Sequence, residues 1–459
     1  MNLRSSPLQS LPATSKSCDV LVIGAGIVGV AIALRLQQEG REVLLIDRER
    51  VAAQASRGNA GALAFSDVLP LASPGMLRKA PRWLLDPLGP LAIRPRYLPQ
   101  LAPWLFRFWR ASRGERVRSG IAAQAAMMDL SAIETPTMLA AAGASHMLRT
   151  DGVLHLYESE AELQASLSEW QARADHGIAF THLHSPRAIA ELQPDLSPAL
   201  VAATFVPGWK TVTDPLLVTE TLARRFEQQG GSIRRADAAA LLFGTDGVTV
   251  RFRDGAPLVA RRVVVAAGAW SHHLARTLSE HIPLETERGY NTTLPVGAFD
   301  LKRQLTFGGH GFVVTPLACG VRVGGAVEFA GLDAAPNFAR ARALLAKAKR
   351  FMPELRTEGG SEWMGFRPSL PDSLPAIGPA AADERVIYAF GHGHLGLTQA
   401  AATARLVADI MSGRTPPLDL TPFRPQRFSS ARTEARNAEH RLVRSDQTSP
   451  RSGNRKESS

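Results

Sequence analysis

Near the N-terminus, two short and almost continuous apolar runs flank a glycine-rich turn and a stretch with helical spacing. The first run covers residues 19–23, and the second covers residues 42–47 and ends in a carboxylate, Asp47. Runs of this length are typical of strands buried on both faces of a sheet. Between them, residues 30–36 place apolar side chains at helical intervals, and Gly40 is a plausible helix stop. The pattern predicts a strand–helix–strand unit.

Similar patterns along the rest of the chain predict an α/β fold. We expect an amphipathic helix at 215–230, short strands at 232–235, 247–253 and 262–267, an antiparallel sheet over 283–330, a helix at 339–349, and strand, loop, strand and helix over 362–413. Residues 1–17 and 429–459 are rich in small and polar residues, and we expect both to be disordered.

Composition places the chain among ordinary globular proteins. Hydrophobic residues make up 45% and charged residues 21% of its 459 residues, which excludes wholesale disorder, collagen and coiled coil. Cys18 and Cys319 are the two cysteines and form no disulfide framework, so we expect a reducing, cytoplasmic compartment. No apolar run reaches the ~18–20 residues that span a bilayer, and the first seventeen residues do not resemble a secretory signal.

The net charge of +11 is concentrated in one basic segment between Arg78 and Arg118, which holds ten Lys or Arg and two Asp or Glu. A basic balance of this kind is common in nucleic-acid-binding proteins. Here, however, three of the seven tryptophans and several Leu and Phe lie among the cations. This mixture favours a membrane interface over nucleic acid, because aromatic rings and Arg share the headgroup layer. A buried helix with solvated Arg edges is the open alternative.

The sequence Gly24-Ala-Gly26-Ile-Val-Gly29 follows the first predicted strand and begins the helix, as in a dinucleotide fingerprint. The first glycine permits the tight turn, the second lets the backbone approach a pyrophosphate, and the third allows close helix–strand packing. The pyrophosphate would lie at the positive end of the helix dipole. Asp47 is placed to bind both ribose hydroxyls and disfavours a 2′-phosphate. The predicted ligand is FAD or NAD, not NADP.

Two further segments favour FAD. A small, polar, turn-forming stretch runs from Ser56 through Asn59 and Ala60 to Gly61, and another buried strand ends in a small-residue turn at Ala267-Gly268. A nucleotide site assembled from three distant segments fits an interleaved FAD domain better than a contiguous NAD domain. A plain surface loop is the alternative for residues 56–61.

Together with two later motifs, these residues resemble the D-amino acid oxidase superfamily of flavoproteins, and most of all its bacterial D-amino acid dehydrogenases. The later motifs are Gly365-Phe-Arg-Pro368, with Pro371-Asp372 after it, and Gly391-His-Gly-His-Leu-Gly396. The similarity covers residues 18–428. It implies FAD, oxidation of a D-amino acid or secondary amine to an imine that hydrolyses, and transfer of electrons to the respiratory chain.

Within this resemblance, several points stay open. Some relatives attach flavin through a Cys before the proline turn, where this chain has Met364-Gly365, so we predict non-covalent FAD. Residues 288–290 and 327–333 are similar to D-hydroxyproline dehydrogenases, which suggests D-proline or cis-4-hydroxy-D-proline as substrate. The alternatives are a glycine or sarcosine oxidase that produces peroxide, and a non-catalytic flavin subunit of a membrane complex. The basic segment suggests peripheral attachment to the cytoplasmic face of the inner membrane, near a quinone.

The resemblance also assigns the site residues. Arg367 is the predicted carboxylate clamp, because a guanidinium holds a carboxylate with two fixed donors. Tyr290 is predicted to line the substrate pocket, with a core aromatic as the alternative. We predict no catalytic base and no metal, since the histidines lack ligand spacing and His392 and His394 fit a loop against the flavin better than a catalytic pair. The predicted cofactor-binding residues are Ile23, Gly24, Gly26, Ile27, Val28, Gly29, Asp47, Arg48, Ser56, Asn59, Ala60, Gly61, Ala238, Ala267, Gly268, Gly391, His392, Gly393, Gly396, Leu397 and Thr398.

The predicted organisation is an interleaved Rossmann-type FAD-binding domain plus an α+β substrate domain with a mixed or antiparallel sheet. The FAD-binding domain is assigned residues 18–80, 206–275 and 360–428. The substrate domain is assigned residues 81–205 and 276–359.

Overall fold

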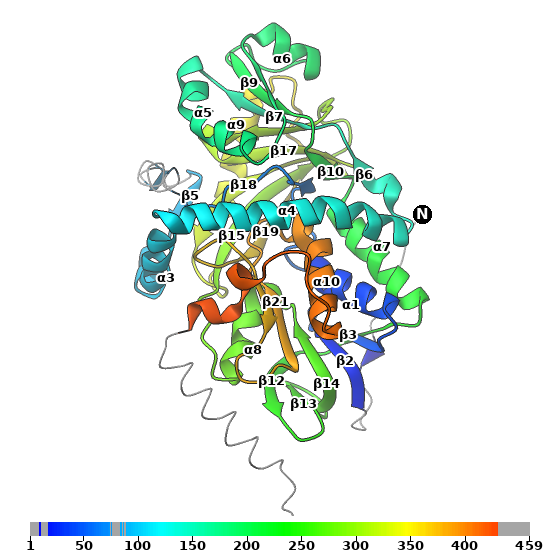
Figure 1. The fold of residues 1–459 in the computed structure, drawn as a ribbon. Coiled ribbons are helices and arrows are strands. Elements are labelled where there is room, and N and C mark those ends of the chain that lie inside the picture. The colour runs from blue at the N-terminus through cyan, green and yellow to red at the C-terminus, as the bar shows by residue number, and fades with distance from the viewer. Residues whose placement is uncertain are drawn as a thin grey trace, which may run out of the picture.

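Two nine-stranded sheets and the helices packed on them make up most of the molecule (Figure 1). The computed structural model describes residues 17–73, 75, 83, 84, 86 and 89–429, and the backbone of residues 9 and 10. The first sheet contains β1 (Gln9–Ser10), β2 (Ser17–Ile23), β3 (Val43–Asp47), β11 (Ser232–Arg235), β12 (Ala238–Phe243), β13 (Val248–Phe252), β14 (Leu258–Val265), β20 (Ala376–Pro379) and β21 (Val386–Phe390).

The centre of this first sheet is parallel, in the order β11, β3, β2, β14, with β21 beside the end of β14. Strands β2 and β3 pair in parallel across helix α1 (Ile27–Gln38), which confirms the predicted strand–helix–strand unit. Residues 20–23 of β2 and Val43, Leu45 and Ile46 of β3 are buried, as expected for apolar runs in a parallel sheet. Strands β12, β13 and β20 extend the sheet in antiparallel fashion.

A layer of helices packs on one face of this sheet, formed by α1, α7 (Pro215–Gln228), α10 (Gly396–Ser412) and, outermost, α4 (Glu115–Ala141). Helix α10 is buried along most of its length because Ala and other small residues let α1 and α4 approach it closely. The cluster between the helices and the sheet includes Val30, Leu34, Leu406 and Val407, all at most 1% exposed.

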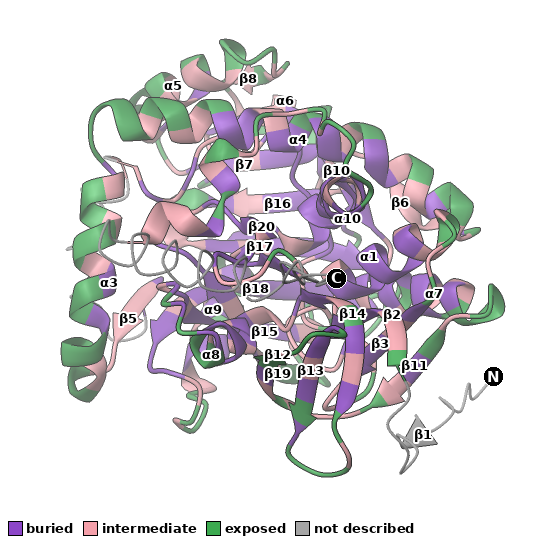
Figure 2. Ribbon diagram, turned by 60° about the horizontal axis from the view of Figure 1, so that its bottom comes forward, coloured by how far each residue is buried: buried purple, intermediate pink, exposed green. Residues whose placement is uncertain are grey.

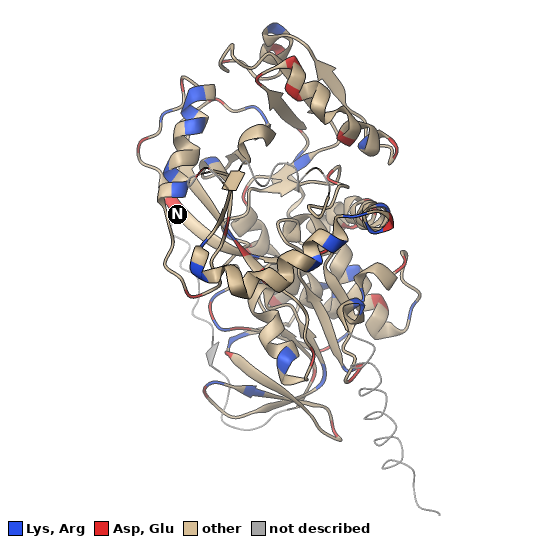
Figure 3. Cartoon of the chain, turned by 90° about the vertical axis from the view of Figure 1, so that its left-hand side faces the viewer, with Lys and Arg blue, Asp and Glu red and all other residues tan. Residues whose placement is uncertain are grey.

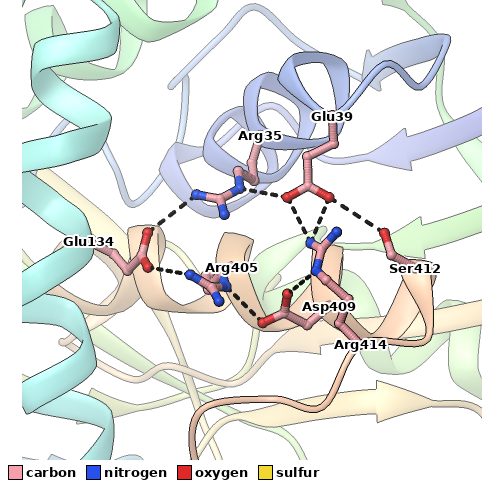
Figure 4. Close-up of polar contacts among 7 residues, drawn as sticks. All are labelled: Arg35, Glu39, Glu134, Arg405, Asp409, Ser412 and Arg414. Atoms are coloured by element: carbon pink, nitrogen blue, oxygen red, sulfur yellow. Dashed lines mark hydrogen bonds and ion pairs between the residues drawn. The ribbon is translucent and has the colours of Figure 1, made fainter.

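A ring of ion pairs fixes these helices relative to one another (Figure 4). Glu134 of α4 accepts from Arg35 of α1 at 3.3 Å and from Arg405 of α10 at 3.0 Å. Arg405 also binds Asp409 at 2.8 Å, and Asp409 binds Arg414 at 2.7 Å. The ring closes through Glu39 of α1, which contacts both Arg35 and Arg414. The carboxylate of Asp409 is fully buried, so its two guanidinium partners compensate its desolvation.

The second sheet has the order β19, β15, β18, β17, β16, β7, β9, β8, with β5 beside β18. Its strands are β5 (Leu91–Ile93), β7 (Val153–Tyr157), β8 (Thr181–Leu183), β9 (Ala202–Val206), β15 (Glu285–Leu294), β16 (Gln304–Phe307), β17 (Phe312–Leu317), β18 (Gly320–Phe329) and β19 (Ser361–Ser369). Strands β15 to β18 lie within the predicted antiparallel sheet and pair in that way, whereas β7 pairs with β16, and β5 with β18, in parallel.

The remaining elements include a small third sheet and five further helices, of which α8 (Ser271–Thr277) packs against β12 of the first sheet. A small third sheet consists of β4 (Ala62–Leu63), β6 (Leu148–Arg149) and β10 (Lys210–Val212). The other helices are α3 (Leu98–Ala111), α5 (Glu160–Ala174), α6 (Pro186–Leu192) and α9 (Ala339–Phe351). Figure 2 shows α3 at the edge of the molecule, with exposed residues along its outer side. None of the described helices has the length and apolarity needed to cross a bilayer.

The observed strand pairing and helix packing differ from the predicted domain boundaries in three places. Strand β19 was assigned to residues 360–428 of the FAD-binding part, but it pairs with β15 of the second sheet over nine residues. Val206 ends β9 of that same sheet. Helix α4, predicted in the substrate part, packs on α10 because its small and apolar face fits the helix layer of the first sheet.

The predicted disorder at the two ends concerns residues that lie almost entirely outside the described part of the chain. The exceptions are Ser17, which begins β2, Ser429, and the backbone of Gln9–Ser10, which pairs in parallel with β11. The prediction is therefore wrong for Gln9, Ser10 and Ser17. Cys18 and Cys319 are free thiols.

Candidate functional site

A cavity of about 1460 Å³ extends from the ends of the parallel strands of the first sheet to one face of the second sheet. Ligands in open parallel sheets bind outside the carboxyl ends of the strands, and β2, β3 and β14 end at this cavity. The predicted site residues that line it are Ile23, Gly24, Gly26, Ile27, Val28, Asp47, Arg48, Ser56, Asn59, Ala60, Ala238, Ala267, Gly268, Tyr290, Arg367, His392, Gly393, Gly396, Leu397 and Thr398. Three predicted glycines do not line it: Gly29, Gly61 and Gly391.

The glycine turn after β2 is as tight as its sequence indicates. Gly24 has φ +110°, and a Cβ there would lie 2.4 Å from the carbonyl oxygen of Ala266 on the neighbouring strand segment. A Cβ on Gly29 would lie 1.8 Å from the carbonyl oxygen of Gly24. Gly29 therefore lets α1 pack closely against the turn, as the fingerprint predicts for its third glycine.

Asp47 and Ser56 fasten this turn from two sides. The Asp47 carboxylate accepts hydrogen bonds from the backbone N–H groups of Ala25 at 2.7 Å and Glu49 at 2.8 Å. Burial raises the pKa of Asp47, and these backbone bonds oppose the rise. The Ser56 hydroxyl accepts from the N–H of Ile27 at 3.0 Å, at the start of α1, where a helix dipole attracts anions.

The loop over residues 56–61 is anchored to the second sheet. Asn59 accepts from the N–H of Gly61 at 2.8 Å, which forms a local turn. Arg322 of β18 donates to the carbonyl of Asn59, and Asn291 of β15 donates to the carbonyl of Gly58 at 2.9 Å. The Oδ1 atom of Asn291 is buried without a protein partner and belongs to a side chain at the cavity wall. Asn291 is missing from the predicted set, because Tyr290 beside it lines the same cavity and the alternation along β15 does not single out Asn291.

At the other side of the glycine turn, an aromatic–cation pair borders the cavity. The guanidinium of Arg48 lies 3.6 Å from the ring centroid of Trp270. Trp270 lies two residues after Gly268, and its ring meets Phe366 edge-on at 5.4 Å. Trp270 is missing from the predicted set because a lone tryptophan beyond a strand carries no periodic signal.

Arg367 reaches the cavity from β19 and has no carboxylate within ion-pair distance among the described residues. Its guanidinium donates to the carbonyls of Ala326 at 3.1 Å and Gly325 at 3.5 Å. A Cβ on Gly289, two residues along β15 from Glu287, which is opposite Arg367, would lie 2.4 Å from Nη2, so the glycine leaves the space that the arginine occupies. Burial lowers the pKa of Arg367, with Glu287 opposing, but a guanidinium stays charged. A cation held by neutral carbonyls is a ready site for a carboxylate.

The loop before α10 closes the cavity beside Arg367. His392 bonds Thr403 at 2.9 Å through Nε2, and burial lowers its pKa to about 3, so the ring is neutral. His394 lies 3.4 Å from a carboxylate oxygen of Asp67. Thr398 accepts from the N–H of Ala64 and donates to the carbonyl of Ala62, which ties the start of α10 to β4.

Tyr290 borders the cavity, but its hydroxyl faces a buried polar network. It donates to Glu328 and accepts from the N–H of Asn337 at 3.1 Å. Glu328 also binds Arg94 at 2.9 Å, and Arg288 lies 3.8 Å away. With 1% exposure, Tyr290 positions the wall of the cavity, and a contact with substrate stays a prediction.

Comparison with known proteins decides the family. The family model DAO, described as FAD dependent oxidoreductase, matches residues 19–410. The chain belongs to this family. A D-amino-acid oxidase of Bradyrhizobium diazoefficiens is 35% identical over 419 residues, which cover 89% of this chain and 98% of the relative. A D-amino acid dehydrogenase of Rhizobium johnstonii is 30% identical, with 87% and 97% covered.

Solved structures of the family share the fold. A glycine oxidase from Geobacillus kaustophilus has a TM-score of 0.69 at 20% identity, covering 90% of this chain and 100% of its own. An L-proline dehydrogenase from P. horikoshii also has a TM-score of 0.69, at 19% identity, covering 90% and 98%. Identities this low show a common architecture and leave the substrate open.

The residues present fit FAD, the cofactor of this family. The turn at Gly24 and Gly26 has no side chain that would block an approaching diphosphate, and the N-terminus of α1 supplies N–H groups. Asp47 lies at the end of β3 where a ribose would be bound. Asn291, whose Oδ1 atom has no partner among the described residues, and Arg367 lie further along the same cavity, toward the second sheet.

Proposed function

We propose that the chain is an FAD-dependent D-amino acid dehydrogenase, with Arg367 as the clamp for the substrate carboxylate. The observation that carries the proposal is a guanidinium without a carboxylate partner among the described residues, held by two carbonyls at the wall of the FAD-family cavity. The relatives named D-amino-acid oxidase and D-amino acid dehydrogenase, which align along nearly their whole length, support the substrate class. FAD, when bound, would accept a hydride from the substrate, and this hydride carries both electrons of the oxidation.

The protein contributes orientation and electrostatics. Arg367 binds the carboxylate in two-donor geometry and thereby fixes the direction of the Cα–H bond. The N–H groups at the start of α10, at Gly396, Leu397 and Thr398, present the positive end of a seventeen-residue helix to the cavity. They favour negative charge on whatever ring lies against them.

Two candidate bases among the described residues of the cavity, His392 and Tyr290, are not arranged toward a substrate amine. His392 is neutral and bonded to Thr403, and the hydroxyl of Tyr290 is engaged by Glu328 and Asn337. The substrate amine therefore enters in its neutral form or loses its proton to solvent. Neither Cys18 nor Cys319 lines the cavity, which supports non-covalent attachment of FAD.

The electron acceptor is part of the proposal, and helix α3 supports a membrane acceptor. Its inner side packs through Leu101 and Trp104 against Phe329, while Phe106 is 58% and Trp109 is 38% exposed. We call the exposed residues Leu98, Phe106 and Trp109, with the exposed cations Arg107 and Arg110, the α3 face. Figure 3 looks at this side of the molecule, with Lys and Arg in blue. Aromatic rings flanked by arginines suit an anionic bilayer surface, where a quinone pool is accessible. Much of the adjoining stretch from Arg78 to Arg82 lies outside the described residues.

Vesicle flotation tests the α3 face. Replacing Phe106 and Trp109 by Ser should reduce binding to phosphatidylglycerol vesicles at least tenfold, because two exposed rings supply most of the apolar anchor. The matched control replaces Leu242 and Val296, which are exposed to 38% and 74% elsewhere, and should bind as the native chain does. Equal binding by both double variants would contradict membrane docking through α3.

Steady-state kinetics test the reaction itself. We expect D-amino acids to reduce a soluble quinone analogue through the purified holoprotein, with little oxygen uptake. The name of the Bradyrhizobium relative favours the second candidate, an oxidase, and rapid oxygen consumption with peroxide formation would select it. D-proline and cis-4-hydroxy-D-proline belong in the substrate panel, since the sequence favours cyclic substrates.

A further inference from the structure

Beyond Arg367, the cavity continues to an end lined by His155, Trp170 and Trp209, which we call the aromatic end. His155 of β7 meets the ring of Trp170 edge-on at 5.0 Å and the ring of Trp209 edge-on at 6.2 Å. We propose that the aromatic end is a subsite for the side chain of a large, uncharged, preferably aromatic D-amino acid. This inference rests on the proposed function and adds the substrate class to it.

The strand register places the aromatic end and Arg367 along one line across the second sheet. Arg367 lies over β18, on the carbonyls of Gly325 and Ala326. On the cavity face, Gly324 of β18 is opposite Val313 of β17, Val313 is opposite Thr306 of β16, and Thr306 is beside His155 of β7. From β18 to β7 there are three strand spacings, about 14 Å.

The strand surface between Arg367 and the aromatic end, which we call the floor, leaves space above it, because Gly324 has no side chain and Val313 and Thr306 have short ones. All three line the cavity or belong to its wall. A substrate held by its carboxylate at Arg367 therefore finds open space toward the aromatic end. A methyl side chain extends least toward the rings, whereas a benzyl or indolyl group extends several ångströms further in that direction.

The polar groups of the aromatic end are already satisfied or neutral. The indole N–H of Trp170 donates to the hydroxyl of Tyr157 at 2.8 Å, and that of Trp209 donates to Gln304 at 3.2 Å. Both tryptophans therefore offer only ring surface to a ligand. Such surfaces favour edge-to-face and offset contacts with another aromatic ring.

The charges around the aromatic end cancel. Arg173 of α5 lies 3.7 Å from Asp67 and over the ring of Trp170 at 4.8 Å, and Asp67 also contacts His394. Burial, reinforced by Arg173, lowers the pKa of His155 to about 3, so that ring adds no charge near neutral pH. A carboxylate or ammonium group on the substrate side chain would lose its hydration here without gaining a free counter-ion.

Anaerobic bleaching of the bound flavin by a panel of D-amino acids tests the subsite. We expect kcat/KM for D-phenylalanine and D-tryptophan to exceed that for D-alanine by at least tenfold, since even one buried methylene gives 10- to 200-fold discrimination. D-aspartate and D-lysine should be poorer than D-phenylalanine by a similar factor.

Two variants test whether the aromatic end and the floor beside it cause this substrate preference. Trp209→Leu should lower the ratio of kcat/KM for D-phenylalanine to that for D-alanine about tenfold. Thr306→Glu, which places a carboxylate on the floor, should raise the ratio of D-lysine to D-phenylalanine at least tenfold. Its matched control, Thr245→Glu on an exposed loop, should leave every ratio unchanged.

The outcomes separate the two proposals. If no D-amino acid bleaches the flavin, the proposed function itself is wrong. If D-alanine or D-proline is the best substrate, or if both variants keep the native ratios while retaining bound flavin, the dehydrogenase stands and the aromatic subsite is overturned.

Discussion

Replacing Arg367 by alanine is the most informative single change at the site. In the native chain the guanidinium faces the cavity with only the carbonyls of Gly325 and Ala326 as partners, so its charge is available to a ligand. Hydrogen bonds to charged groups contribute about 1.5–3 kcal/mol each, and a carboxylate takes two from one guanidinium. Water entering the space vacated in the variant recovers part of this. We therefore expect a net loss of about 3–4 kcal/mol, which is ~150- to 900-fold in kcat/KM.

The loss should appear mainly in KM. The substrate carboxylate keeps its charge throughout the reaction, so Arg367 binds it in the ground state and in the transition state, and loss of Arg367 should raise KM and leave kcat within about threefold. Arg367→Lys should recover only part of the affinity, because an ammonium lacks the planar pair of donors. The assay is dye-linked turnover with D-phenylalanine and D-alanine, alongside the flavin absorbance of each variant.

Arg342→Ala is the matched control. Arg342 is 63% exposed on α9 and forms a surface pair with Glu362, so its loss should change neither KM nor flavin content. A KM for Arg367→Ala within threefold of the native value, with flavin still bound, would refute the assignment of Arg367 as the carboxylate clamp.

Three further predictions concern the scaffold. Gly29→Ala should destabilise the fold by about 2–3 kcal/mol and reduce the amount of bound flavin, because the new Cβ would lie 1.8 Å from the Gly24 carbonyl oxygen. Urea unfolding measures the first effect and flavin absorbance the second. Native values in both assays would contradict the tight turn. Asp409→Ala should cost about 2 kcal/mol in urea unfolding, because Arg405 and Arg414 each lose one of their two carboxylate partners. An unchanged free energy of unfolding would mean that the ion-pair ring adds no stability. His392 has a pKa of about 3 in the folded chain and about 6.5 when unfolded, so its contribution to stability is complete above pH 6.5 and declines as the pH falls toward 3. Between pH 7 and pH 5, the free energy of unfolding of His392→Gln should therefore fall by about 2 kcal/mol less than that of the native chain. An equal fall in both proteins would contradict a neutral buried ring.

Local patterns predicted the nucleotide-binding part of the fold well. Continuous apolar runs and three glycines specify β2, α1 and β3, because a buried parallel strand and a close helix–strand contact leave few alternatives. The alternating pattern of residues 283–330 likewise predicted the antiparallel pairing of strands β15 to β18.

The pairing of strands far apart in the sequence could not be predicted from local patterns. The residues of β19 carry the Gly-Phe-Arg-Pro motif of the resemblance, but nothing in their local pattern indicates that they pair with β15 and not with the first sheet. Asn291, Arg322 and Trp270 reach the cavity only because the two sheets meet there. Such residues are visible once strand faces are known, and a single sequence does not supply that information.

The central claim is that a carboxylate-bearing amine of D configuration reduces the flavin of this protein at Arg367. Anaerobic stopped-flow mixing of the holoprotein with D- and L-enantiomers of one amino acid tests it most directly. We predict complete loss of the oxidised flavin absorbance with the D-enantiomer, at least a hundredfold faster than with the L-enantiomer, and a saturation constant that rises in Arg367→Ala. Equal rates for both enantiomers, or an oxidised spectrum that persists with every amino acid tried, would contradict the account.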